Sequence, residues 1–261
     1  GEPGYPDGAA RAARLSVCLT GLGCRVFHLS CAGLDSAGAG LINELARRGV
    51  NVDFMERAEP SAPGSRPVMT NTALLAARAM ISSCHLMAVV PDIPEETFDF
   101  ALRVARHFGV PVLCAAAPGF DYIGSRIRML DVLVAGDDAA LELSRIRPSD
   151  METAEEAVDY FLKKGAGASV VYHGARGATA GCEIREAAHY PAPVSEGQFE
   201  EQSEDMFVAA LCCALTLRRP LSDAATYAIA AAAAAAGARP DATPPGHREI
   251  TQKLAPSRQS R

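Results

Sequence analysis

Short apolar runs alternate along the chain with segments in which apolar residues recur every three or four positions. The runs are typical of buried strands, and the wider spacing is typical of amphipathic helices. The predicted strands cover residues 26–30, 86–90, 110–114, 132–134 and 169–172, and a hairpin-like stretch extends to residue 190. The predicted helices cover residues 37–48, 94–108, 153–164, 205–217 and 222–236.

Two of these helices carry clear signals at their ends. Pro94 stands at the first position of one helix, and Gly109 ends it. The apolar face of this helix is predicted to bury Ala101, Leu102, Ala105 and Phe108. The stretch from Thr153 to Glu156 is predicted to be a capping box that begins the next helix.

Strands that are separated by helices predict right-handed crossovers and a doubly wound, mostly parallel sheet. The strands are apolar without interruption, which indicates that helices cover both faces of the sheet. Residues 1–240 are therefore expected to form one α/β domain. Residues 241–261 form a basic tail that carries four cationic side chains against Glu249, namely Arg248, Lys253, Arg258 and Arg261. Such a tail is commonly solvated, and the alternative is an anchor to a partner protein with a minor contact to RNA.

Composition excludes several classes of function. The formal net charge of −6 argues against a surface devoted to nucleic-acid phosphates. No apolar run is long enough to span a membrane. The eight cysteines form no C-x-x-C pair and no metal-ligand spacing with a histidine, so we expect free thiols and neither a metal nor another cofactor. The chain starts at Gly1 rather than Met, which suggests processing or trimming, and residues 8–14 are rich in Ala and Arg like a transit peptide or a helix start.

Seven short stretches carry a family resemblance when they are taken in order. They are LGCRV at 22–26, GLDSAG at 33–38, LARRGVNV at 45–52, GVPVL with AP at 109–118, GARG at 174–177, DMFVAAL at 205–211 and the alanine-rich segment with GARP at 230–240. Together they resemble the ribokinase-like (PfkB) carbohydrate kinases over nearly the whole chain. The resemblance implies the ribokinase-like form of the doubly wound fold.

Parts of that fold are reduced or absent in this sequence. The family's first strand, which supplies an aspartate that holds the sugar, should precede residue 8 and is not found. The strands of the lid, which covers the substrate and often forms the dimer interface, are cut down to an exposed loop over residues 56–67. Such losses expose sheet edges and apolar surface, so the resemblance implies obligate protein partners.

The resemblance also locates the sugar and metal motifs, and both are altered. At the family's GG-x-x-x-N sugar motif this chain has Ala9, Ala10 and Arg14. At the N-x-x-E motif of the magnesium network it has Asp137 and Asp138 instead. These acids are expected to cap a helix, and the alternative is that they replace the metal's oxygen ligands.

The nucleotide and catalytic motifs are degenerate as well. Gly174 and Gly177 retain a vestige of the nucleotide-binding turn, although two glycines at this spacing also make a plain turn. The family's D-T-T-G-A-G-D motif forms an anion hole and ends on the catalytic base. Here residues 199–205 read FEEQSED, so only Asp205 remains, as a degenerate vestige that we expect to serve as a helix-start residue. The four acids of this stretch should repel a nucleotide's phosphates.

The sequence thus predicts a catalytically inactive pseudoenzyme that acts as a structural or scaffolding subunit. Its expected partners are other protein subunits of a large assembly, with a mitochondrial and ribosomal setting favoured over a cytoplasmic or plastid one by analogy of fold. One alternative is a residual or altered ATP-dependent sugar or nucleoside kinase, with Asp205 as the base. Another is a regulatory module that binds a nucleotide without turnover.

Overall fold

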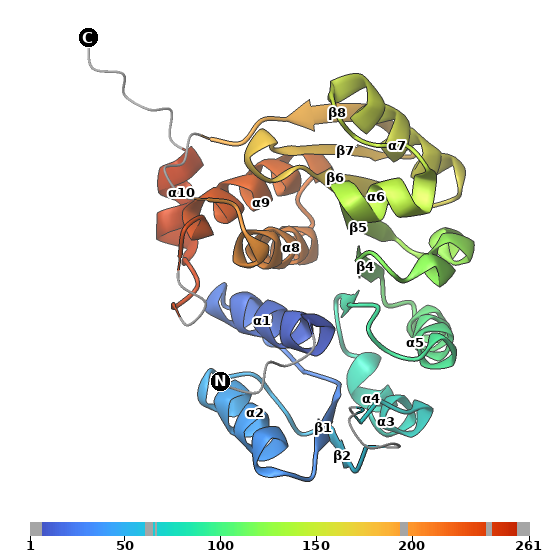
Figure 1. Ribbon diagram of the computed structural model, residues 1–261, viewed down its shortest axis with the longest axis vertical. Helices are drawn as coiled ribbons and strands as arrows, with labels where there is room; N and C mark the ends of the chain where they lie inside the picture. The colour runs from blue at the N-terminus through green and yellow to red at the C-terminus, as the bar shows by residue number, and fades with distance from the viewer. Residues whose placement is uncertain (1–6, 61–64, 66, 194–197, 239–241, 255–261) are drawn as a thin grey trace.

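The computed structural model describes residues 7–60, 65, 67–193, 198–238 and 242–254, with the side chains of residues 7–10 left aside (Figure 1). Its helices are α1 (Asp7–Gly21), α2 (Ser36–Arg47), α3 (Asn71–Ala76), α4 (Arg78–Ile81), α5 (Glu95–Phe108), α6 (Asp137–Ser144), α7 (Met151–Lys163), α8 (Glu201–Thr216), α9 (Leu221–Ala235) and α10 (His247–Leu254). Its strands are β1 (Cys31–Gly33), β2 (Glu56–Ala58), β3 (Met87–Val89), β4 (Val112–Ala116), β5 (Val132–Gly136), β6 (Ala168–Tyr172), β7 (Ala178–Cys182) and β8 (Arg185–Tyr190).

The main sheet has six strands in the order β3-β4-β5-β6-β7-β8. The first four are parallel, and β7 and β8 continue the sheet as an antiparallel hairpin. Successive residues of one strand point to opposite faces of the sheet. Val134 packs with α8 and α9 on one face, whereas Leu133 packs with α5 and α7 on the other. Helices therefore cover both faces of the sheet (Figure 1), which confirms the predicted doubly wound α/β fold.

A separate two-stranded parallel sheet is formed by β1 and β2, with Cys31 opposite Glu56. The prediction of a strand at residues 26–30 was wrong, because of these residues only Phe27 makes a bridge, to Asn51. A strand forms only where its backbone pairs with that of a neighbouring strand. The paired residues of this segment begin at Cys31. The predicted exposed loop at 56–67 is likewise shorter, since its first three residues form β2, and residues 61–64 and 66 lie outside the described part.

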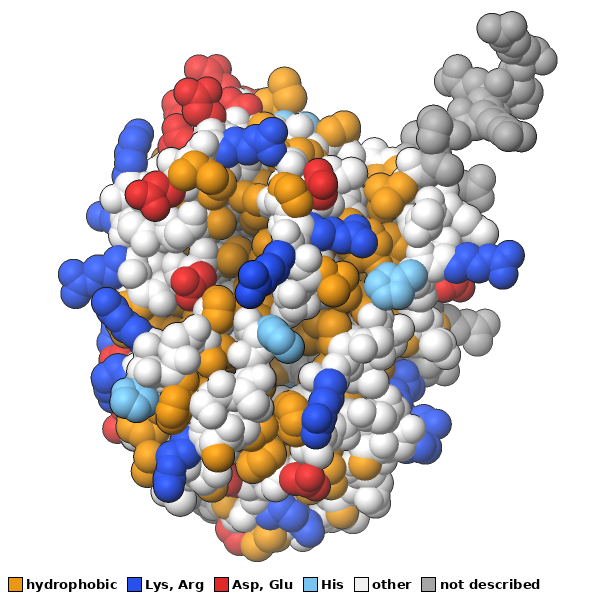
Figure 2. All heavy atoms as spheres, turned by 180° about the vertical axis from the view of Figure 1, so that it is seen from behind, with side chains coloured by type: hydrophobic (Ala, Val, Ile, Leu, Met, Phe, Trp, Pro, Cys, Tyr) orange, Lys and Arg blue, Asp and Glu red, His pale blue; other side chains and the backbone are white. Residues whose placement is uncertain are grey.

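A cavity of about 1470 Å³ separates the two sheets. All three residues of β1 and all three of β3 line it, so the outer edges of both sheets face this space. Leu34 and Val68, two more residues of its lining, are largely exposed. Figure 2 shows apolar side chains gathered across the middle of the rear face, among lysine and arginine side chains.

Three helix predictions need correction. Phe108 lies in the last turn of α5 but is 37% exposed, whereas the other three predicted core residues of this helix are buried. The capping box of α7 is made by Asp150 and Thr153, so this helix begins at Met151. The carboxylate of Asp150 accepts the N–H of Thr153 at 2.9 Å. Helix α8 begins at Glu201, four residues before the predicted start.

The predicted domain boundary at residue 240 also moves. Helix α10 packs against α9, and its Ile250 is fully buried in the core shared with α8. The imidazole of His247 joins it to the rest of the fold, since Nε2 donates to the carbonyl of Leu22 at 3.0 Å. Residues 247–254 of the predicted tail therefore belong to the domain, and Arg258 and Arg261 lie outside the described residues.

All eight cysteines are free thiols, as the sequence predicts. Among the described residues, no helix has the length and apolar character that crossing a membrane requires.

Candidate functional site

Three parallel strands end at one place, and α8 begins over them. This is the edge of an open α/β sheet at which ligands bind. The last residue of each strand meets this place: Arg11 of α1 donates to the carbonyl of Ala116 at 3.4 Å, and the carboxylate of Glu204 lies over Gly136, 3.6 Å from where a Cβ would stand. The third, Tyr172, stacks on Phe207 with ring centroids 4.5 Å apart.

Helix α1 lies against α8 across this edge (Figure 1). Residues three or four apart share one face of a helix, which places Arg11 and Arg14 together on α1. The same spacing places Glu201, Glu204 and Asp205 together on the first turns of α8. The packing of the two helices therefore brings two guanidinium groups onto three carboxylates.

Asp205 is the centre of this ion-pair network. Its Oδ2 lies 2.5 Å from Nε of Arg14, and its Oδ1 lies 3.4 Å from Nε of Arg11. The same two arginines reach the outer acids, since Arg11 pairs with Glu204 at 2.7 Å and Arg14 pairs with Glu201 at 3.1 Å. Both oxygens of Asp205 thus face a cation supplied by the chain itself.

The side chain of Asp205 is only 3% exposed. Burial raises the pKa of this carboxyl to about 6, and the two arginines offset part of that effect. A carboxylate with this pKa has the basicity that a general base requires near neutral pH. The arginines would nevertheless have to move before a substrate hydroxyl could approach it.

Two expectations about this stretch are corrected. Asp205 is not a helix-start residue, because α8 begins at Glu201 and Asp205 lies one turn further on. The acids do not form an uncompensated negative patch either, because Arg11 and Arg14 bind three of them. The carbonyl of Glu200 accepts the N–H groups of both Ser203 and Glu204.

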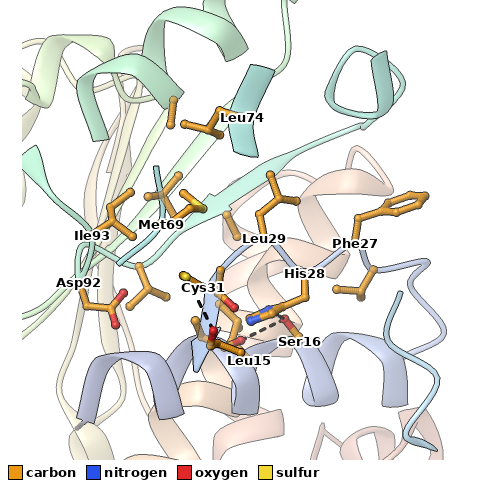
Figure 3. A pocket seen from close by; sticks show the side chains of 18 of the residues that line it. Leu15, Ser16, Phe27, His28, Leu29, Cys31, Met69, Leu74, Asp92 and Ile93 are labelled. Atoms are coloured by element: carbon orange, nitrogen blue, oxygen red, sulfur yellow. Dashed lines mark hydrogen bonds between the residues drawn. The ribbon is translucent and has the colours of Figure 1, made fainter. Parts of the chain in front are cut away.

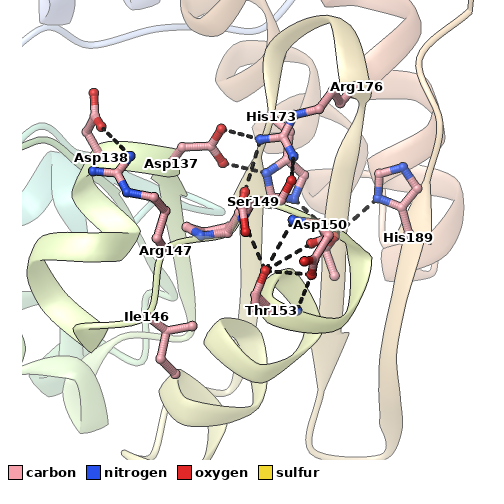
Figure 4. A network of polar contacts seen from close by, with 12 residues as sticks. Asp137, Asp138, Ile146, Arg147, Ser149, Asp150, Thr153, His173, Arg176 and His189 are labelled. Carbon is pink, nitrogen blue, oxygen red and sulfur yellow. Dashed lines mark hydrogen bonds and ion pairs between the residues drawn. The ribbon is translucent and has the colours of Figure 1, made fainter.

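A second polar network lies next to the first, at the turn between β6 and β7 (Figure 4). Asp137 accepts from Nδ1 of His173 and from Arg176, each at 2.5 Å. Arg176 also donates to the carbonyls of Pro148 and Ser149. These bonds tie the turn to the start of α6 and to the chain before α7.

The interior of this turn is polar but closed. Nε2 of the buried His173 lies 3.0 Å from Oγ1 of Thr179, which in turn lies 3.3 Å from Nδ1 of His189. The ring of Tyr172 lies instead in the core with α8 and α9, and its hydroxyl is buried without a hydrogen-bond partner.

The two glycines of the turn have a structural explanation. Gly174 and Gly177 both have positive φ, at 60° and 106°. A Cβ on Gly177 would lie 2.1 Å from the carbonyl oxygen of Tyr190, so this position excludes every other residue. The requirements of the turn are therefore sufficient to account for both glycines.

The two acids at the start of α6 fit neither interpretation of them. Gly136 is the N-cap of α6 and no side chain caps the helix, so the capping prediction was wrong. Asp137 is held by His173 and Arg176, and Asp138 lies 3.9 Å from Arg147. Within the described ranges, no group of three or more His, Cys, Asp or Glu side chains could hold a metal ion. These residues do not fit the family's magnesium site.

Comparison with known proteins places this geometry in a family. The sequence profile described as "pfkB family carbohydrate kinase" matches residues 62–245, more than half of the chain. The chain belongs to the pfkB family. A ribokinase of Schizosaccharomyces pombe is 26% identical over 226 residues, which cover 78% of this chain and 71% of that relative. A ribokinase of Haemophilus influenzae is 22% identical over 186 residues, which cover 64% of this chain and 61% of the relative.

Solved structures agree with this assignment at the level of fold. The structure of Arabidopsis thaliana ribokinase complexed with ribose and ATP superimposes with a TM-score of 0.80, at 16% identity. The superposition covers 95% of this chain and 87% of the plant ribokinase. The ribokinase-like fold that the motifs indicated is therefore confirmed.

The residues that the sequence analysis assigned to the family's sugar motif lie in α1. Residues 9 and 10 have no described side chains, and Arg14, the expected counterpart of the family's asparagine, binds Asp205. In the family's next motif, Asp35 caps α2 by accepting the N–H of Gly38 at 2.8 Å. Both polar residues thus bind partners within the chain.

The cavity between the two sheets of this pfkB chain does not include Asp205 in its lining. Figure 3 shows this cavity from close by. Leu15 and Ser16 of α1 line it together with Met69 and Ile93. The hydroxyl of Ser16 lies 2.8 Å from Nδ1 of the buried His28, and burial lowers the pKa of His28 to about 4. The cavity therefore has an apolar wall with a neutral imidazole in it.

Sequence reasoning missed the part played by Arg11. Its acidic partners lie more than 190 positions away in the chain, and no local pattern specifies such a contact. The assignment of Arg14 to the family's asparagine position was the one signal, since a cation predicted next to an acidic residue points to an ion pair.

Proposed function

We propose that this pfkB-family protein is a catalytically inactive scaffold. The observation that carries the proposal is the state of Asp205, which is buried and held by Arg11 and Arg14. A base must reach the substrate hydroxyl, and here the guanidinium groups stand where the hydroxyl would have to lie. Glu204 adds a carboxylate over Gly136, next to where a transferred phosphoryl group would need positive surroundings.

In this proposal, catalysis is lost because a substrate cannot reach Asp205 and because the surrounding charges are unfavourable. The carboxylate itself is still present. Removing the two arginines would not restore an enzyme, since Glu204 would still place a carboxylate over Gly136. Asp137, at the altered metal motif, is likewise held by Arg176 and His173.

The test is phosphotransfer by the purified chain. ATP with Mg²⁺ is supplied with ribose, other pentoses or nucleosides, and sugar phosphate is measured beside an Asp205→Asn control. We expect the two proteins to give the same background, because the arginines occupy the carboxylate. Sugar phosphorylation by the parent protein that disappears in Asp205→Asn would refute the proposal.

The same proposal makes the chain a subunit of a larger assembly, with the mitochondrion and its ribosome as the favoured setting. Leu34 and Val68, two exposed apolar residues of the cavity lining, support it because a partner at this cavity would cover them. The open edges of β1 and β3 support it for the same reason. The test is sedimentation of the endogenous protein from fractionated native cells. Migration as a free monomer outside mitochondria would count against this setting.

A kinase with residual activity is the second candidate. The pKa of Asp205, at about 6, favours it, and the matched relatives are named ribokinases. Calorimetry with ATP and Mg²⁺ separates the alternatives. Binding with turnover favours the kinase, binding without turnover favours a regulatory nucleotide-binding module, and absence of binding favours the scaffold.

A further inference from the structure

Strands β1 and β3 each have a neighbouring strand on one edge only. Among the described residues, β1 pairs only with β2, and β3 pairs only with β4. Every residue of both strands lines the cavity of about 1470 Å³ between the two sheets. The two unpaired edges therefore face the same space, and each offers backbone donors and acceptors to it.

The backbone hydrogen bonds show which groups point into this space. The carbonyl of Ser30 accepts an N–H of β2 at 2.9 Å, so the backbone of the next residue, Cys31, points to the other edge of β1. The N–H of Met87 donates to the carbonyl of Pro111 at 2.9 Å, so that of Ala88 points away from β4. Ser30 lines the cavity as well, and its hydroxyl is buried with no hydrogen-bond partner in the described part of the chain.

The apolar lining of the cavity belongs to both cores of the main sheet. Leu15 of α1 is part of the core on the α8 face, and Leu74 of α3 is part of the core on the α5 face. Figure 3 shows these two side chains on opposite sides of the cavity. A strand between β1 and β3 would therefore be buried on both faces, and strands buried in this way are apolar throughout rather than alternating.

The size of the cavity favours a segment of polypeptide over a small molecule. Small-molecule sites in proteins commonly have volumes of about 300–1,000 Å³, and this cavity, at about 1470 Å³, is larger. Three residues of a strand occupy on the order of 500 Å³, given a rise of ~3.3 Å per residue, ~4.8 Å between strands and ~10 Å between packed sheets. The cavity thus accommodates the stretch that β1 and β3 can pair, together with its flanking residues.

The stretches of this sequence outside the described residues do not offer such an apolar run. They read GEPGYP, SAPG, VSEG, RPD and APSRQSR, apart from the single Arg66. None of them has three aliphatic or aromatic residues in succession. The occupant that these observations favour is therefore a segment of another protein.

We propose that β1 and β3 receive a strand from a partner protein, whose uncharged apolar segment pairs with both edges and joins the two sheets into one. Its backbone supplies hydrogen-bond partners to Cys31 and Ala88, and its side chains pack between α1 and α3. In this mode of recognition, backbone hydrogen bonds provide affinity and the side-chain pockets provide specificity. This contact rests on the proposed function, since it requires that the chain is a subunit of an assembly.

The test compares the endogenous protein in its isolated native assembly with the recombinant chain alone. Cys31 lines the cavity, and its alkylation by iodoacetamide under native conditions is measured by mass spectrometry after digestion. We expect alkylation of Cys31 to be lost in the assembly, and that of Cys182, at the end of β7 and outside the lining, to be retained. Equal alkylation of Cys31 in an intact assembly would overturn the strand addition but not the scaffold. A free monomer in native cells would overturn both.

Photocrosslinking identifies the occupant. The position used is Leu34, which follows β1, lines the cavity and is exposed, so that p-azidophenylalanine can replace it. We expect a single partner protein, cross-linked at or next to an uncharged apolar run. A cross-link to a charged stretch, to a second copy of this chain or to the chain itself would overturn the proposal. Protection of Cys31 in the recombinant chain alone would do the same, because the cavity would then need no partner.

Matched variants at Ala88 separate backbone pairing from side-chain packing. Ala88→Pro removes the N–H that points into the cavity and leaves the bond of Met87 in place, whereas Ala88→Ser keeps both. We expect Ala88→Pro to be lost from the assembly in sedimentation and Ala88→Ser to remain in it. Thermal unfolding of the isolated variants checks that both are folded, and the protection of Cys31 decides if Ala88→Pro is not. Full incorporation of folded Ala88→Pro would contradict the pairing.

Discussion

At the scale of single residues, the site around Asp205 is defined by ion pairs between side chains of the chain itself. Asp205 is the predicted counterpart of the family's base, but its oxygens bind Arg14 and Arg11. Attraction between these charges does not fully offset the cost of removing a carboxylate from water, because its pKa is still raised. The ionised form of Asp205 is therefore a source of strain in the folded protein at neutral pH.

This strain predicts a pH dependence of stability. The pKa of Asp205 rises from 3.8 to about 6 on folding, so the folded state binds more protons between these values and stability falls as pH rises through them. We expect the stability of the parent protein relative to Asp205→Asn to fall by on the order of 3 kcal/mol between pH 4 and pH 7. Urea unfolding of both proteins across this range measures the difference. A relative gain in stability with rising pH would show that the arginines outweigh burial.

The turn between β6 and β7 gives a second prediction at this scale. Gly177→Ala places a Cβ against the carbonyl of Tyr190 and should reduce the free energy of unfolding by about 3 kcal/mol or more. The control is Gly40→Ala in α2, where a Cβ meets nothing within 4 Å, and it should stabilise by about 0.5–1 kcal/mol. Thermal unfolding compares the variants. An unchanged midpoint for Gly177→Ala would favour a purely ligand-binding reason for this glycine.

At the scale of elements, the sequence predicts the main sheet and its helices well where the signals are local. The stop of α5 at Gly109, for example, is confirmed by its left-handed backbone. Local signals fail where the environment decides: Phe108 follows the apolar spacing of α5 but lies at its exposed end. The ion pairs of Arg11 were beyond prediction because they join segments at opposite ends of the chain.

Helix α10 is a second case in which local signals fail, since its charged residues led to the prediction of a solvated tail. Ile250 is fully buried among α8 and α9 residues, so Ile250→Ala should reduce the free energy of unfolding by about 2–4 kcal/mol. Thr251→Ala, at the exposed neighbouring position, should change it by less than about 0.5 kcal/mol. Guanidinium unfolding measures both. Equally small changes in the free energy of unfolding for both variants would indicate that α10 is only loosely attached to the domain.

At the scale of the whole molecule, the protein consists of a main sheet and a small sheet with a cavity between them. The outer edges of β1 and β3 face that cavity, whereas β5 and β6 are paired on both sides. Backbone groups at an unpaired edge exchange with solvent through smaller openings than those inside a sheet.

Hydrogen exchange should therefore divide the molecule at the cavity. We expect peptides that cover β1 and β3 to exchange faster than peptides that cover β5 and β6, when native exchange is followed by mass spectrometry. Equal protection of the four strands in the isolated protein would mean that the cavity is closed in solution. Slower exchange confined to β1 and β3 in a native assembly would place a partner against these edges.

The order of strands in the main sheet has a consequence for how the chain assembles. From β3 to β8, each strand lies beside the next one in the chain, so the sheet can grow by short steps as the polypeptide is made. Helix α1 cannot follow this course, because its partner α8 is synthesised some 190 residues later. The ion pairs of Arg11 and Arg14 with the acids of α8 therefore form only after the sheet is complete. The contact that covers Asp205 is one of the last to form. Pulse labelling during refolding would detect this delay as late protection of α1, and early protection of α1 would exclude it.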